Sequence, residues 1–501
     1  MPENLVRLKE RLARLKRLSE VSELLGWDQQ TYMPEGAAAS RGEQSAVLSQ
    51  LIHDTFVSSE TADVLGAAEQ EIAGADPDSD DVRMLAVVRR DFDRETRVPS
   101  DLVAELSRHQ AVAHSIWVRA RKENDFASFA PALEKMLDLT RRRAEALGYT
   151  EHIYDALLEG YEPGLKRSEV AAMFAGIKPA LVEMTRAIGA SARPVDASLL
   201  HRSYPTEVQK SLTLKLAEEF GFDLKRGRQD EAAHPFCSGF NRDDVRLTTR
   251  LDPNYLGQGL YATLHETGHG LYEQGFTVEY DPTPLGTAAS LGVHESQSRL
   301  WENMVGRSRN YCVHLFPQLQ AAFPGALGNE TTESFYRAVN RVEPSLIRVE
   351  ADEVTYNLHI MLRFELECEL LTGELKVSDL PEAWNTRMQA YFGITPPTDS
   401  EGVLQDVHWS AGLIGYFPTY SLGNVMSGQL WHAVRRAHPD LEEQIRRGQF
   451  AQLLEWLRAN VHRYGRKYSP ATLIEKATGE PINSRYYLEY LTAKFSEIYG
   501  L

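Results

Sequence analysis

Two histidines four residues apart constrain the fold of this chain more than any other feature of its sequence. His265 and His269 enclose the motif His-Glu-Thr-Gly-His, and apolar residues recur around them at helical spacing. On a helix, residues four apart lie one turn above each other, so both imidazoles could bind the same metal ion. Asp252, which precedes a proline, predicts the start of this helix, and Gly275 predicts its end.

The residue after the first histidine suits hydrolytic chemistry. Glu266 could take a proton from a metal-bound water, and a hydrolytic zinc site usually has three protein ligands and one open position. Glu273 lies eight residues beyond His265, about 12 Å along a helix axis, which is too far for a shared ion. Glu295 is the better third ligand. Its segment, residues 290–304, predicts a second helix, which a proline-containing loop could fold back against the first.

Charge and composition exclude several classes of partner. The chain has 501 residues, with 54 basic and 71 acidic side chains and a net charge of −17, which argues against nucleic acid or an anionic membrane as partner. Its three cysteines are scattered and lack metal-site spacing, as in proteins of a reducing compartment. The N-terminus has no apolar leader segment, and no later run is long enough to span a bilayer. We therefore expect a cytoplasmic protein.

Helical periodicity dominates the chain, and strand character is confined to one region. Three segments show the helical period clearly: residues 5–18, 82–122 and 127–147. Val245 and Leu247 alternate with polar residues, which predicts a short sheet over residues 234–250. An extended peptide could add to the edge of this sheet, but a purely structural hairpin explains the pattern equally well.

Two further segments carry polar groups whose roles stay open. Residues 344–371 predict a long helix, on which Arg348 and Asp352 would ordinarily form a surface ion pair. Residues 402–420 are rich in glycine and aromatic side chains, which predicts a loop through the interior. Three of its side chains could either donate to an oxyanion or be satisfied core residues: His408, Tyr416 and Tyr420.

Seven short segments, in the same order along the chain, resemble the M32 metallocarboxypeptidases, the thermostable carboxypeptidases of bacteria, archaea and some protists. The segments are Trp27-Asp28 to Met33-Pro34, His234-Pro235-Phe236, Asp244-x-Arg246-x-Thr248, His265 to His269, His294-Glu295-Ser296, Ile347-Arg348-x-x-Ala351-Asp352 and Gly402-x-x-Gln405-Asp406-x-His408-Trp409. They cover nearly the whole chain, and no matched position departs from the family pattern.

The resemblance implies a mostly α-helical, cleft-bearing fold of the neurolysin and angiotensin-converting-enzyme type, with a small antiparallel β-sheet beside the active site. It implies one catalytic domain over residues 1–501, in two helical lobes around a deep cleft, with a helical lid over roughly residues 1–80. A cytosolic homodimer with one zinc ion per chain, or cobalt in its place, is also implied. The implied activity is release of single residues from free C-termini of peptides, with broad specificity but poor cleavage at proline.

The likeness also implies roles for individual residues. The metal ligands would be His265, His269 and Glu295, with Glu266 as general base. The other candidates are Arg348 for the terminal carboxylate, Arg246 for limiting how the peptide C-terminus sits, His234 and Tyr416 for substrate binding, and Tyr420 and His408 for the oxyanion. Two alternatives stay open. One is an oligopeptidase or dipeptidyl carboxypeptidase on the same scaffold, and the other is a peptide-binding scaffold with a structural metal, against which the general base argues.

Overall fold

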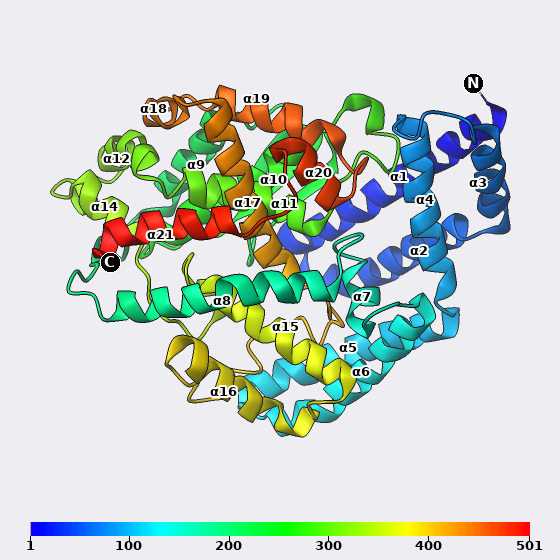
Figure 1. The fold of residues 1–501 in the computed structure, drawn as a ribbon, viewed down its shortest axis with the longest axis horizontal. Helices are drawn as coiled ribbons and strands as arrows, with labels where there is room; N and C mark the ends of the chain where they lie inside the picture. The colour runs from blue at the N-terminus through cyan, green and yellow to red at the C-terminus, as the bar shows by residue number, and fades with distance from the viewer. Residues whose placement is uncertain (1) are drawn as a thin grey trace. The chain divides into compact units, whose positions relative to one another are not determined.

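The computed structural model describes residues 2–501, and its secondary structure is mostly α-helical, as predicted (Figure 1). The chain forms two compact units, each assembled from segments that are distant in sequence. The first unit contains Met1–Thr96, Asp196–Val339 and Leu430–Pro481, and the second contains Arg97–Val195, Asn340–Gln429 and Ile482–Leu501. Two lobes around a cleft, with a lid over residues 1–80, stay a prediction.

Four helices at the N-terminus of the first unit share one apolar core. Their bounds are α1 Glu3–Thr31, α2 Ala38–Phe56, α3 Ser59–Glu71 and α4 Asp80–Arg97. Leucines of α1 that recur at helical spacing belong to one buried cluster with apolar residues of α3 and α4. Figure 1 draws these helices in blue. The segment 82–122, which shows the helical period, forms parts of two helices, because Pro99 disfavours helical backbone at the residue before it.

Helix α10 carries the two histidines and packs against α9 and α11. The remaining helices of the first unit, α10 included, have these bounds: α9 Thr206–Phe220, α10 Leu256–Glu273, α11 Leu291–Arg299, α12 Arg309–Ala322, α13 Pro324–Leu327, α14 Thr332–Val339, α18 Leu441–Arg446, α19 Ala451–Asn460 and α20 Pro470–Thr478. Apolar side chains and glycines bury α10 on nearly every side, which is typical of a helix in the centre of a large core.

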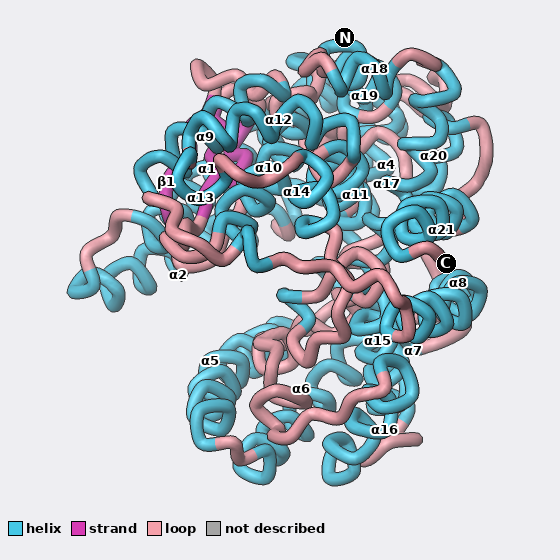
Figure 2. Tube along the Cα trace, turned by 90° about the vertical axis from the view of Figure 1, so that its left-hand side faces the viewer, coloured by secondary structure: helices cyan, strands magenta, loops and turns pink. Residues whose placement is uncertain are grey.

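A three-stranded sheet packs against α10, and its topology differs from the antiparallel one expected (Figure 2). Strand β3 (Asp244–Thr249) pairs antiparallel with β2 (Cys237–Asn241) and parallel with β1 (Gly227–Glu231), so the sheet is mixed. Strand β1 was not predicted, because its residues are mostly polar and lack an alternating apolar pattern. Pairing with β3 makes this segment a strand.

The second unit is helical throughout. Its helices are α5 Ser100–Glu123, α6 Phe126–Leu147, α7 Ile153–Leu158, α8 Arg167–Gly189, α15 Tyr356–Thr372, α16 Leu380–Phe392 and α21 Arg485–Tyr499; α17, Pro418–Ala437, begins in this unit and ends in the first. The long helix expected from residue 344 is wrong in its first part, because α15 begins only at Tyr356. The carboxylate of Asp352 accepts hydrogen bonds from the backbone N–H groups of Val354 and Thr355, and the turn they form precedes the helix.

No helix among residues 2–501 has the length and apolar character needed to cross a membrane.

Candidate active site

Helix α10 begins later than the sequence suggested. It starts at Leu256, because the carboxylate of Asp252 accepts a hydrogen bond from the N–H of Asn254 (2.8 Å) and so forms a turn ahead of the helix. The predicted end of the helix agrees better with the observed one, since the last helical residue is Glu273 and Gly275 follows two residues later. A side chain at Gly275 would collide with the ring of His462, so this glycine is also required by packing.

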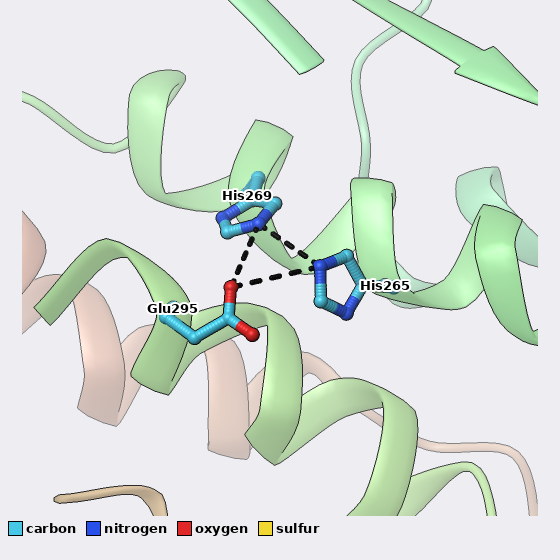
Figure 3. A group of neighbouring side chains, drawn as sticks. All are labelled: His265, His269 and Glu295. Carbon is cyan, nitrogen blue, oxygen red and sulfur yellow. Dashed lines mark hydrogen bonds and ion pairs between the residues drawn. The ribbon is translucent and has the colours of Figure 1, made fainter. Parts of the chain in front are cut away.

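A glycine in the motif brings the second helix against the first. A Cβ atom built on Gly268 would lie 2.6 Å from the Cα of Ser298 and 2.7 Å from the carbonyl oxygen of Gln297, both on α11. Because no side chain intervenes, the two backbones can approach this closely. Helix α11 begins as predicted at Ser290, whose hydroxyl accepts a hydrogen bond from the N–H of Val293 (3.0 Å). Its approach brings Glu295 to the histidines (Figure 3).

The three predicted ligands converge on one point. The Nε2 atoms of His265 and His269 are 3.2 Å apart, and Oε2 of Glu295 lies 3.7 Å and 3.6 Å from them (Figure 3). Tetrahedral zinc with bonds of about 2.1 Å holds its ligand atoms about 3.4 Å apart. The spacing in the structure therefore fits a divalent ion bound by two imidazoles and one carboxylate.

A second carboxylate orients the first histidine. Nδ1 of His265 lies 2.9 Å from Oε2 of Glu302, which fixes the tautomer that leaves Nε2 free to bind metal. Glu302 lies in a π-helical segment, Leu300–Val305, that continues α11. Arg299 donates to Oε1 of Glu295 (2.7 Å) and to Oε2 of Glu302 (3.2 Å), so one guanidinium ties the two carboxylates together. Sequence reasoning did not indicate this role for Glu302.

The electrostatics of the site suit a cation. Burial lowers the pKa of His269 to about 3, so this imidazole is neutral. Burial alone would raise the pKa of Glu295, but Arg299 and the two histidines together outweigh burial and lower this pKa well below the usual range. Burial by itself would lower the pKa of His265. The negative charges of Glu295 and Glu302 outweigh burial, and this pKa is raised. Burial raises the pKa of Glu266 to about 7.

The second unit contains a buried cluster of charges around Asp406. Nε and Nη2 of Arg348 donate to Oδ1 of Asp406 at 3.0 Å and 2.9 Å, and Nε of Arg363 donates to Oδ2 at 2.6 Å. The alternative of a surface pair between Arg348 and Asp352 is therefore wrong. Sequence reasoning missed Asp406 and Arg363, although Asp406 belongs to one of the seven family segments. Two arginines share one carboxylate here, which leaves the cluster with surplus positive charge.

Three more of the predicted residues lie next to this cluster. Nε2 of His408 is 3.4 Å from the hydroxyl of Tyr420, and the ring of Tyr416 packs edge-on against that of Tyr420 at 5.3 Å. Burial lowers the pKa of His408 to about 4, so its imidazole is neutral near neutral pH. The structure therefore brings together Arg348, His408, Tyr416 and Tyr420 within the second unit.

The remaining two candidates lie on or beside the sheet of the first unit. Arg246 of β3 donates to both carboxylate oxygens of Asp244 at 2.9 Å, and its guanidinium stacks on the rings of Trp27 (4.3 Å) and Phe240 (4.9 Å). Trp27 is thus a packed, buried residue near the end of α1. His234 is exposed in the loop between β1 and β2.

Comparison with known proteins agrees with this geometry. Residues 7–495 match the family described as "Carboxypeptidase Taq (M32) metallopeptidase". Thermostable carboxypeptidase 1 of Thermus thermophilus is 42% identical over 494 residues, with 96% of each chain covered, and carboxypeptidase 1 of Bacillus subtilis is 36% identical, with 98% of this chain and 99% of the relative covered. The crystal structure of the M32 carboxypeptidase from Deinococcus radiodurans R1 is 41% identical and superimposes with a TM-score of 0.97 over 99% of this chain and 100% of that one. The chain belongs to the M32 family of metallocarboxypeptidases and is a peptide hydrolase.

Proposed function

We propose that this protein is a zinc-dependent carboxypeptidase that releases single residues from free C-termini of peptides, with broad side-chain tolerance but poor cleavage at proline. The observation that carries the proposal is the trio of ligand atoms on α10 and α11, spaced 3.2–3.7 Å apart, with the buried carboxyl of Glu266 between the two histidines in sequence. We further propose one ion per chain, with cobalt as a substitute, in a cytoplasmic homodimer without nucleic-acid or membrane partners.

Glu266 is the general base of the proposed reaction. The bound ion would supply Lewis acidity, which polarises the scissile carbonyl and acidifies a water. Glu266 takes the proton from the attacking water and passes it to the leaving amine. Its burial suits this exchange, because a carboxyl with a pKa of about 7 can both accept and return a proton near neutral pH.

Tyr420 and His408 are the proposed hydrogen-bond donors of the reaction. The hydroxyl of Tyr420 and the imidazole of His408 stabilise the oxyanion that develops on the scissile carbonyl. His408 donates as a neutral imidazole rather than as an imidazolium, because burial lowers its pKa to about 4. Tyr416 packs on both side chains and contributes to substrate binding.

Arg348 is the proposed anchor for the terminal carboxylate of the peptide. Three of its five N–H groups bind Asp406 and the hydroxyl of Tyr356, which leaves two for a ligand. Two N–H groups of one guanidinium match the two oxygens of a carboxylate. Arg246 is the second choice, because Asp244 already neutralises it one to one. We propose that Arg246 limits how the peptide C-terminus sits, with His234 nearby in sequence as a further contact.

Two peptides of the same sequence, one with a free C-terminus and one amidated, test the reaction. Mass spectrometry of the products should show loss of single residues from the free peptide only, and a chelator should abolish it. Glu266→Gln should keep the metal but lose about 100-fold or more in rate. Cleavage of internal bonds in both peptides would instead indicate an oligopeptidase.

Arginine variants test the anchor. In Arg348→Ala the preference for the free acid should vanish, whereas Arg348→Lys should keep part of it, because lysine retains the charge but not the paired donors. Arg387→Ala is the matched control, since Arg387, like Arg348, pairs with a carboxylate in the second unit, that of Glu369, but has no proposed role. If Arg348→Ala still prefers the free acid as strongly as the control does, Arg348 is not the anchor, and the same comparison on Arg246→Ala follows.

A further inference from the structure

We propose that Glu273 and His294 form a positioning pair that holds the imidazole of His269 in its metal-binding orientation. The inference rests on the proposed metal site and assigns roles to two residues that the mechanism above does not use. Both belong to the elements that build the site: Glu273 is the last residue of α10, and His294 precedes the ligand Glu295 on α11.

The two histidine ligands are supported differently. Nδ1 of His265 binds Glu302 at 2.9 Å, as metal-binding histidines usually do with their second nitrogen. Nδ1 of His269 is buried and has no hydrogen-bond partner among residues 2–501. No hydrogen bond at Nδ1 therefore restrains the rotation of the His269 ring about its Cβ–Cγ bond, and on that side packing must do so.

The ring of His294 supplies that packing. It stacks on the ring of His269 with centroids 4.3 Å apart and planes 27° from parallel. Nε2 of His294 lies 2.8 Å from Oε1 of Glu273, so the carboxylate fixes the stacking ring in turn. Glu273 follows His269 by four residues on α10, hence it lies one turn along the same helix face and reaches His294 on α11 from that side.

The sheet leaves space for this carboxylate at one glycine. A Cβ atom built on Gly239 of β2 would lie 2.6 Å from Oε2 of Glu273 and 2.7 Å from its Cγ. Any larger residue there would have to displace the carboxylate from His294. The chain thus holds Glu273 between β2 and α11, in the position that supports His294.

Metal affinity measured by competition with a chromogenic chelator tests the pair on the whole protein. His294→Ala removes both the stacking ring and the hydrogen bond, and we expect zinc affinity to fall about 10- to 100-fold, the usual effect of removing a group that orients a metal ligand. His294→Phe keeps a stacking ring and should lose less. Glu273→Gln and Gly239→Ala should each weaken binding, because the first weakens the carboxylate's hydrogen bond and the second displaces the carboxylate.

A matched pair elsewhere in the first unit provides the control. Nε2 of His314 lies 3.1 Å from Oε2 of Glu219, with similar side-chain exposure, 22% and 23% against 19% and 14% for His294 and Glu273. His314→Ala should leave zinc affinity unchanged. The visible absorption of the Co²⁺-loaded protein should change in His294→Ala and not in His314→Ala, because it reports the geometry of the ligands.

The outcomes separate this inference from the proposed function. If the parent protein binds no zinc, the metal site itself is wrong. If the parent binds zinc and His294→Ala, His294→Phe and Gly239→Ala all bind it as tightly as His314→Ala does, the positioning pair is wrong and the metal site stands. Weaker binding in His294→Ala and Gly239→Ala, with metal-free unfolding midpoints like that of His314→Ala, supports the pair.

Discussion

Replacing Gly268 by alanine should weaken the metal site without touching any ligand. The new Cβ would lie 2.6 Å from the Cα of Ser298, whereas ordinary contacts begin at 3.4 Å. The new Cβ would overlap backbone atoms of α11, so no flexible side chain can move aside to relieve the overlap. The two helices α10 and α11 must therefore separate by about 0.8 Å. Glu295 lies three residues before Ser298 on α11 and moves with it.

The displacement is large compared with what a metal site tolerates. Zinc–ligand bonds vary by about 0.2 Å around their normal lengths, so a shift four times larger cannot be accommodated without distortion. Forcing a methyl group into a packed interior costs about 1–3 kcal/mol. If that cost appears entirely as lost metal binding, zinc affinity falls about 5- to 150-fold.

Zinc titration against a competing chelator, with thermal unfolding of the metal-free protein alongside, measures both parts of this cost. Gly66→Ala is the control, because Gly66 lies inside α3 of the same unit and a Cβ there meets no atom within 4 Å. We expect unchanged zinc affinity in Gly66→Ala and a gain in stability of up to about 1 kcal/mol, since alanine favours helix over glycine. Parent-like zinc affinity and parent-like stability in Gly268→Ala would refute the close-packing argument.

Three further perturbations follow from the structure. Glu302→Ala removes the partner of Nδ1 of His265 and should weaken zinc binding about 10- to 100-fold in the same titration; unchanged affinity would mean that His265 needs no second carboxylate. Chelation should lower the unfolding midpoint, and zinc should restore it, because an ion at 1,000 times its Kd stabilises the folded state by about 4 kcal/mol; an unchanged midpoint would contradict a metal bound only by the folded chain. Glu367→Gln tests a buried carboxyl of the second unit. Burial raises the pKa of Glu367 from 4.5 to about 7, so the folded state binds this proton more tightly than the unfolded state. The parent should therefore lose stability relative to the variant as pH rises from about 4.5 to about 7, as unfolding at several pH values would show; parallel pH profiles would contradict it.

Much of the fold and the three metal ligands could be predicted from local patterns alone. His265 and His269 are four residues apart, and helix geometry by itself places them on one face. The apolar repeats of α1 and of residues 290–304 predicted helices that the structure contains. The short strands β2 and β3 were also predicted, because Val245 and Leu247 alternate with polar residues.

Local patterns failed where a residue's environment comes from a distant part of the chain. Strand β1 has a polar sequence and exists because β3 pairs with it, and α15 starts late because Asp352 binds the backbone of a turn ahead of it. The partner of Arg348 is Asp406, which is far away in sequence, rather than the neighbour four residues along a predicted helix.

The side chains that bind the metal, and the carboxylate next to the first of them, can be identified in the amino-acid sequence. The contacts that hold those side chains in place exist only in the folded chain. Glu302 orients His265, His294 stacks on His269, and Gly268 lets α11 approach α10. The two kinds of interaction differ in the separation along the chain over which they act. Helical spacing acts over one or two turns of a single segment, whereas these supports depend on contacts between two helices, and such contacts exist only after the chain has packed.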